Sequence, residues 1–131
     1  MSHSPLLVLT APGDNNVPLL TELRQRATIV VGHSALDFAT AVVDAEIVLN
    51  WSGPQALLRD VFLLSGRVRW KHSRSAGFEQ VLFPELVKSE VILTNSSGVF
   101  SPSLGEFALA AILYFAKAPR PAPSQCRWQP C

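Results

Sequence analysis

The sequence predicts an α/β fold built on a parallel sheet of five strands. Over the first hundred residues, short apolar runs alternate regularly with segments of helical periodicity. The strand segments are mainly apolar rather than alternating, which is typical of parallel strands covered on both faces. Right-handed crossovers between such strands favour a doubly wound, flavodoxin-like sheet in the order 2-1-3-4-5. An apolar helix and a disordered tail are predicted to follow this sheet.

Five segments carry the β-branched and apolar residues that favour strands. They span residues 6–10, 28–32, 46–49, 68–72 and 91–94. Pro12 and Gly13 end the first strand.

Helices are predicted at residues 17–27, 34–43 and 54–64, and a fourth opens at Phe78 and is interrupted by Pro84. Asn16 and Ser34 are the predicted caps of the first two helices. Pro54 lies in the first turn of the third helix, and Gly66 lies just past its end.

The segment 101–117 predicts an unusual helix. Ser103 and Glu106 match a capping box, and residues 107–116 are apolar on every side. A sheet covers only one side of such a helix, so its other side needs a partner. Each large apolar side chain left in water forgoes roughly 1.5–3 kcal/mol. The helix is therefore predicted to meet a second domain or a second chain.

Composition excludes several classes of function. The 131 residues are 48% hydrophobic with a net charge of +1, so no field that attracts nucleic acid is expected. No apolar run is long enough to span a membrane, and no secretory signal is found, so a cytoplasmic protein is expected. Residues 118–131 are rich in proline and predict a disordered tail, in which Cys126 and Cys131 are reduced thiols.

The turn from Ser73 to Gly77 is the candidate binding element. A strand that feeds a helix through small residues leaves backbone N–H groups free at the positive end of the helix dipole, which suits an anion. Gly77 allows either a close approach of the ligand or a positive φ. An ordinary strand-to-helix corner is the alternative interpretation.

Five segments carry a resemblance to a known family. They are residues 70–79, 82–86, 93–95, 98–99 and 103–109. This pattern resembles the D-isomer-specific 2-hydroxyacid dehydrogenases, and among them the glyoxylate/hydroxypyruvate reductase-like members. The resemblance is dense over residues 70–117, looser over 6–66, and stops at Ala118. It implies a substrate-binding domain at residues 1–100, a helix at 101–117 that crosses to a cofactor domain, and truncation before the NAD-binding domain.

The resemblance also implies a role for Ser75, Ala76 and Gly77, whose backbone N–H groups would bind the carboxylate of a small 2-oxo or 2-hydroxy acid. Full-length relatives use NAD or NADP, but this sequence contains no G-x-G-x-x-G run, so no cofactor is expected on this chain. The family's catalytic arginine, glutamate and histidine come from the missing domain. Arg74 is instead interpreted as a solvated or interface charge, and Glu79 as a first-turn helix residue.

Three functions follow as alternatives. The first is a truncated dehydrogenase that binds a 2-oxo acid weakly and is inactive alone, with no catalytic or metal-binding residue. The second is an interaction protein that forms a homodimer, or a heterodimer with a relative, through the 103–117 helix. The third is a flavodoxin-like or receiver-like module, which the sequence disfavours because no acidic cluster follows the first and third strands.

Overall fold

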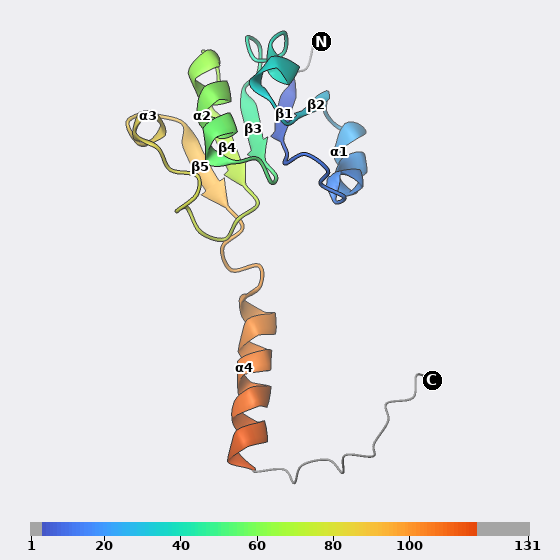
Figure 1. Ribbon diagram of the computed structural model, residues 1–131, viewed down its shortest axis with the longest axis vertical. Coiled ribbons are helices and arrows are strands. Elements are labelled where there is room, and N and C mark those ends of the chain that lie inside the picture. The colour runs from blue at the N-terminus through green and yellow to red at the C-terminus, as the bar shows by residue number, and fades with distance from the viewer. Residues whose placement is uncertain (1–3, 118–131) are drawn as a thin grey trace. The chain divides into compact units, whose positions relative to one another are not determined.

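The computed structural model describes residues 4–117, and its sheet confirms the predicted fold. Five parallel strands of four residues each lie in the order β2-β1-β3-β4-β5 (Figure 1). The strands are β1 (Leu6–Leu9), β2 (Ile29–Gly32), β3 (Ile47–Asn50), β4 (Trp70–Ser73) and β5 (Ile92–Asn95). The predicted strands differ from these by no more than two residues at an end. The order reverses between β1 and β3, which is the topological switch point of such a sheet.

The main core lies between the sheet and helix α2 (Gln55–Leu64). Leu57, Leu58 and Val61 turn one face of α2 inward, as the period of 3.6 residues requires. The sheet contributes Leu7, Leu9 and Val48 to the same cluster. Both ends of α2 match the prediction, because Pro54 precedes its first residue and Gly66 follows soon after its last.

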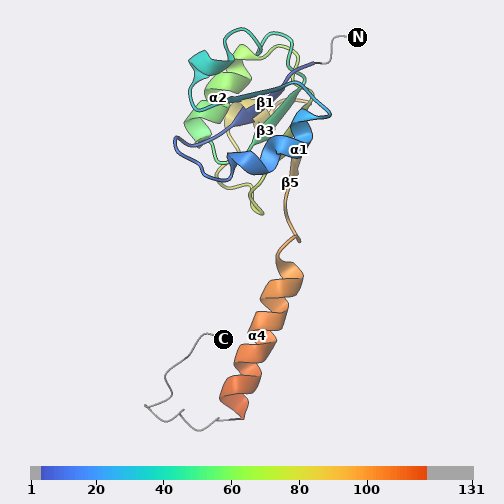
Figure 2. The ribbon, with the colours of Figure 1, turned by 90° about the vertical axis from the view of Figure 1, so that its right-hand side faces the viewer.

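The opposite face of the sheet carries a smaller layer formed by η1 (Val17–Leu20) and α1 (Thr21–Arg24) (Figure 2). The prediction of one helix over residues 17–27 is wrong here, because the segment starts as a 3₁₀ turn and α1 ends at Arg24. Asn16 makes no side-chain cap, and its backbone N–H donates a hydrogen bond of 2.8 Å to the Asp14 carboxylate. Leu20 is buried, whereas Leu19 is 70% exposed.

A second correction concerns residues 34–43, which form the four-residue 3₁₀ helix η2 (Ala35–Phe38) and then irregular turns. Ser34 is the N-cap, as predicted. The Asp37 carboxylate accepts hydrogen bonds of 2.9 Å from the N–H groups of His33 and Ser34. These bonds hold the pKa of Asp37 below its ordinary value, and the bond from His33 has the largest effect.

The third correction falls next to the candidate turn. No helix opens at Phe78; residues 74–81 form bends and turns, and α3 (Pro84–Val87) is a single turn that starts at the proline. Pro84 has no N–H to give to the carbonyl of Gln80, and it holds Phe83 in an extended conformation with φ −144°. The helix dipole expected at Gly77 is therefore absent.

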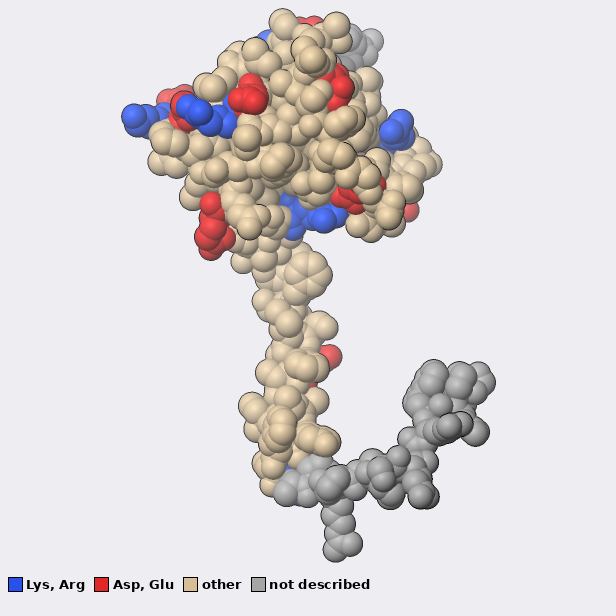
Figure 3. Space-filling view, in the orientation of Figure 1, with Lys and Arg blue, Asp and Glu red and all other residues tan. Residues whose placement is uncertain are grey.

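The chain divides into two compact units between Ser97 and Gly98. In the second unit, the described residues form α4 (Ser101–Ala116), which contains no buried residue. Its N-cap is Phe100, so the predicted capping box of Ser103 and Glu106 is wrong: both residues lie inside the helix. The surface of α4 is almost entirely uncharged, whereas acidic and basic side chains are interspersed on the visible face of the sheet domain (Figure 3). The predicted tail and its two cysteines lie outside the described residues.

Candidate functional site

The candidate site lies at the carboxyl edge of the sheet, where open α/β sheets bind their ligands. Asn50, Ser73 and Asn95 are the last residues of β3, β4 and β5, and they are aligned in register. Because aligned residues of parallel strands point to the same face, the three polar side chains form a row under the turn that follows β4.

Two members of this row hold the predicted turn in place. Asn95 donates a hydrogen bond of 2.6 Å from Nδ2 to the carbonyl of Ala76. The buried Ser73 hydroxyl accepts one of 3.3 Å from the N–H of Ser75, and Ser96 donates its N–H to the Ser75 carbonyl at 3.1 Å. The turn is thus anchored from β4 and from the segment after β5. Sequence reasoning missed these anchors, although the polar residues at the ends of β3, β4 and β5 were a visible signal.

The structure brings the three predicted residues together on one turn. Within residues 4–117, no acceptor is bound to the N–H groups of Ala76 and Gly77. Ser75 and Gly77 line a hollow of about 260 Å³ together with Glu79 and Gln80. The donors therefore come from the local turn alone, without support from a helix.

Gly77 has a steric role that the sequence left open. Its φ is not positive; among the glycines of the described chain, the positive values belong to Gly13 and Gly98. A Cβ on Gly77 would instead collide with the carboxylate of Glu79. Glu79 is not the first-turn helix residue that was predicted, because residues 74–81 form bends and turns; its carboxylate lies against Gly77.

The loop after β3 borders the same edge of the sheet. The Arg74 guanidinium stacks on the Trp51 ring at 4.6 Å from its centroid, so the charge predicted to be solvated is exposed but not free of contacts. The Ser52 hydroxyl donates to the Asp14 carboxylate and accepts the N–H of Ala11 at 3.0 Å. The hydrogen bond from Ser52, followed by that from Asn16, lowers the pKa of Asp14.

Two buried polar atoms of this region have no partner among the described residues. They are Oδ1 of Asn50, which is 6% exposed, and Nε1 of Trp51. A Cβ on Gly53 would lie 2.9 Å from the Asn50 oxygen, so the glycine leaves room for that side chain. Buried polar atoms of this kind are commonly bound by ordered water.

Lys71 of β4 is 1% exposed and was not identified from the sequence. Its ammonium donates a hydrogen bond of 3.0 Å to the Val81 carbonyl and lies 5.7 Å from the centroid of the Phe83 ring. Burial lowers the pKa of this amine to about 8. Lys71 lies beneath the segment that follows the candidate turn, and it does not line the hollow.

The histidines are not placed for acid–base work at the turn. His72 is half-buried, and its Nδ1 lies 2.8 Å from the Thr94 hydroxyl, to which Trp70 also donates. His33 is exposed, and its Nδ1 lies 3.6 Å from the Asp37 carboxylate. His3 lies outside the described residues. Residues 4–117 also contain no group of three His, Cys, Asp or Glu side chains arranged to hold a metal ion.

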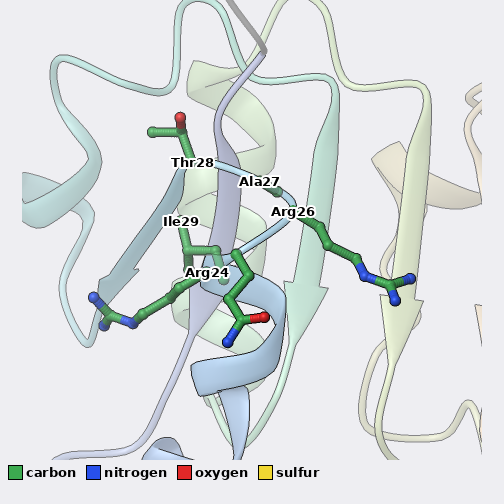
Figure 4. A pocket seen from close by; sticks show the side chains of 6 residues that line it. Arg24, Arg26, Ala27, Thr28 and Ile29 are labelled. Carbon is green, nitrogen blue, oxygen red and sulfur yellow. The ribbon is translucent and has the colours of Figure 1, made fainter.

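A second hollow, of about 420 Å³, is lined by residues 24–29 between α1 and β2. Its two arginines, Arg24 and Arg26, extend in different directions rather than converging on one point (Figure 4). The lining residues are consecutive, so the hollow is the concave side of one connecting segment. It does not form a candidate site.

Among the helices of residues 4–117, none combines the length and the apolar character that crossing a bilayer requires. This finding concerns the described part of the chain alone.

Comparison with known proteins establishes the fold. No family model matches the sequence, and no curated protein does. A solved D-isomer specific 2-hydroxyacid dehydrogenase family protein from Aeromonas salmonicida subsp. salmonicida A449 matches 99% of this chain with a TM-score of 0.62 and 22% identity. A protein from Pyrococcus horikoshii OT3 matches 88% of it with a TM-score of 0.59 and 18% identity. The matches cover 42% and 34% of those longer chains, so this chain has the fold of a part of each.

Proposed function

We propose that residues 4–97 form a substrate-binding domain of the D-2-hydroxyacid dehydrogenase type, which binds the carboxylate of a small 2-oxo or 2-hydroxy acid. The observation that carries the proposal is the turn Ser75–Ala76–Gly77, with free N–H groups at the carboxyl edge of a doubly wound sheet. The fold shared with the Aeromonas dehydrogenase-family protein and the resemblance over residues 70–117 support it.

Backbone N–H groups suit this task because they bind a carboxylate with charge-assisted hydrogen bonds of fixed direction. The anchors from Ser73 and Asn95 keep the donors oriented before the ligand arrives, which lowers the entropy cost of binding. In this chain the turn lacks a helix dipole, and the described residues place no cation in the hollow. The binding is therefore expected to be weak, in the millimolar range.

The described residues do not fit a dinucleotide. A pyrophosphate needs a glycine-rich turn that leads from a strand into a helix N-terminus. Here β1 is followed by the four-residue 3₁₀ helix η1, and the sequence contains no G-x-G-x-x-G run. We therefore assign no chemical step to these 131 residues and propose that, alone, they bind a 2-oxo acid without reducing it.

Chemical-shift mapping with glyoxylate and hydroxypyruvate tests the binding. The amide signals of Ser75, Ala76 and Gly77 are expected to shift in the wild type and to lose the response in Gly77→Val, whose side chain fills the hollow. Gly66→Val is the matched control, because a Cβ there meets nothing within 4 Å and φ is not positive. An unresponsive turn in the wild type would contradict the proposal.

A turnover assay separates binding from catalysis. The purified chain, mixed with NADH and hydroxypyruvate, is expected to leave the NADH absorbance unchanged. Robust oxidation of NADH by the purified chain would contradict the proposal that these residues bind a 2-oxo acid without reducing it.

An interaction function is the second candidate, and α4 favours it. Residues 107–116 carry no charge, and none of the side chains of α4 is buried. An exposed apolar surface of this kind is a typical association site. We propose that two copies of the chain pair through α4.

A further inference from the structure

The hollow at the candidate turn contains an acidic group of the chain itself. Glu79 follows Gly77 by two residues, and its carboxylate lies where a Cβ on Gly77 would lie. Glu79 also lines the hollow with Ser75 and Gly77. Among the described residues, no lysine, arginine or histidine forms an ion pair with it. Its negative charge is thus uncompensated beside the free N–H groups of Ala76 and Gly77.

This position has a consequence for any anion that enters. A ligand carboxylate that approaches the turn meets a like charge within a few ångströms, and it must displace the Glu79 side chain to reach Gly77. The repulsion grows with the charge of the ligand, because Coulomb energy is proportional to the product of the charges. A dicarboxylate is therefore opposed more strongly than a monocarboxylate.

We infer that Glu79 is an internal competitor of the ligand carboxylate, which weakens anion binding at the turn and selects monocarboxylic over dicarboxylic 2-oxo acids. This inference rests on the proposed function, since it assumes that the turn binds carboxylates. It adds a specificity-determining side chain to a site otherwise built from backbone. The Glu79 carboxylate lies in the space that a Cβ on residue 77 would occupy, so the glycine leaves room for this contact.

The test compares ligand affinities of the wild type, Glu79→Gln and Glu79→Ala by chemical-shift titration at the turn. Glyoxylate is the monoanionic probe and 2-oxoglutarate the dianionic one. Glu79→Gln is expected to tighten glyoxylate binding roughly fivefold and 2-oxoglutarate binding by a larger factor. The gain is expected to shrink when the salt concentration rises from 20 to 300 mM, because salt screens exposed charges (the Debye length at 0.1 M is about 10 Å).

The two variants separate charge from bulk. Glutamine keeps the size of the side chain and loses the charge, whereas alanine removes both, so a further gain in Glu79→Ala measures the displacement of the side chain. Glu90→Gln is the control, because Glu90 is an exposed glutamate of the same domain outside the hollow. Dispersed amide spectra confirm that each variant is folded.

The outcomes distinguish this inference from the proposed function. Equal binding by wild type and both variants leaves the carboxylate site intact and overturns the role of Glu79. Weaker binding in Glu79→Gln also overturns it, because Glu79 would then support the ligand. Absence of any response at residues 75–77 in all three proteins contradicts the proposed function itself.

Discussion

At the scale of single residues, Lys71 is the group whose environment is most unfavourable. A buried ammonium needs a counterion, but the Lys71 ammonium contacts the uncharged carbonyl of Val81 and the face of the Phe83 ring instead. The fall of its pKa from 10.5 to about 8 corresponds to roughly 3 kcal/mol of folding free energy lost while the amine is charged.

The sign of the pH dependence follows. Below pH 8 both folded and unfolded chains hold the proton, and the full cost is present. Between pH 8 and 10.5 the folded chain releases the proton while the unfolded chain keeps it, so stability rises with pH. Lys71→Met is expected to remove this rise. It is also expected to stabilise the chain at pH 7 by about 2 kcal/mol, because removing the buried charge gains more free energy than the lost hydrogen bond to Val81 costs.

Urea unfolding at pH 7 and pH 10 measures both effects. Lys88→Met is the control, because Lys88 is exposed and its substitution should leave the pH dependence unchanged. A Lys71→Met variant that is less stable than the wild type at pH 7 would contradict the assigned cost.

Asn95 is a positioning residue for the proposed site. Asn95→Ala removes the hydrogen bond to the Ala76 carbonyl and is expected to cost about 1 kcal/mol of stability. It is also expected to weaken the glyoxylate response at residues 75–77. Asn95→Asp keeps the shape without the donor, and it should fail in the same way. If Asn95→Asp binds glyoxylate as the wild type does, the hydrogen bond has no role in orienting the turn.

At the scale of elements, α2 holds the irregular segment that follows the turn. The Gln55 amide donates to the Leu82 carbonyl at 2.6 Å, and Arg59 donates to both carboxylate oxygens of Glu85 of α3 through Nε and Nη2. The Arg59 hydrogen bond lowers the pKa of Glu85 to about 2. A single-turn helix such as α3 has few contacts of its own, so these links supply much of its order.

Arg59→Met is expected to return the pKa of Glu85 toward its ordinary value near 4.5, which a carbon-detected titration of the side-chain carboxyl measures. A lowered carboxyl pKa stabilises the fold above pH 4.5, and this contribution is lost as the pH falls toward 2. The variant should therefore lose less stability over this acid range than the wild type.

Arg69→Met is the control for that titration, because Arg69 is exposed and forms no ion pair within the described chain. A Glu85 pKa that stays near 2 in Arg59→Met would show that another group holds the carboxylate.

The elements also show why sequence prediction succeeds at α2 and fails at residues 78–87. Pro54 and Gly66 are local signals, and they bound α2 whatever the rest of the chain does. After Phe78 the spacing of apolar residues is equally helical, but the Val81 carbonyl is taken by Lys71 and the Gln80 carbonyl cannot be bonded by Pro84. A contact from another strand thus overrides the local pattern.

At the scale of the molecule, the strand order could be predicted from the sequence. Apolar strands with intervening helices indicate a parallel sheet, and right-handed crossovers then favour the order of its strands. The candidate turn was also predicted, although as the start of a helix that is absent. The anchors at Ser73 and Asn95, and the contact of Glu79 with Gly77, were not predicted, because they depend on strand register and loop conformation. Strand register and loop conformation depend on contacts between distant segments, so no single stretch of sequence predicts them.

The last prediction concerns the assembly of whole chains. Leu104, Phe107, Ile112 and Phe115 of α4 are each more than 60% exposed, and each would gain roughly 1.5–3 kcal/mol from burial. Pairing through α4 is therefore expected to give a species of twice the 14.3 kDa chain mass in size-exclusion light scattering.

The variant Ile112→Glu, which places a charge in this apolar surface, should shift the dimer to the monomer without unfolding the sheet domain. Leu36→Glu is the matched control, since Leu36 is 85% exposed in η2, and it should leave the dimer intact. A wild-type chain that is monomeric at high micromolar concentration would rule out pairing through α4, because the gain from burying these side chains would then fall short of the entropy cost of association.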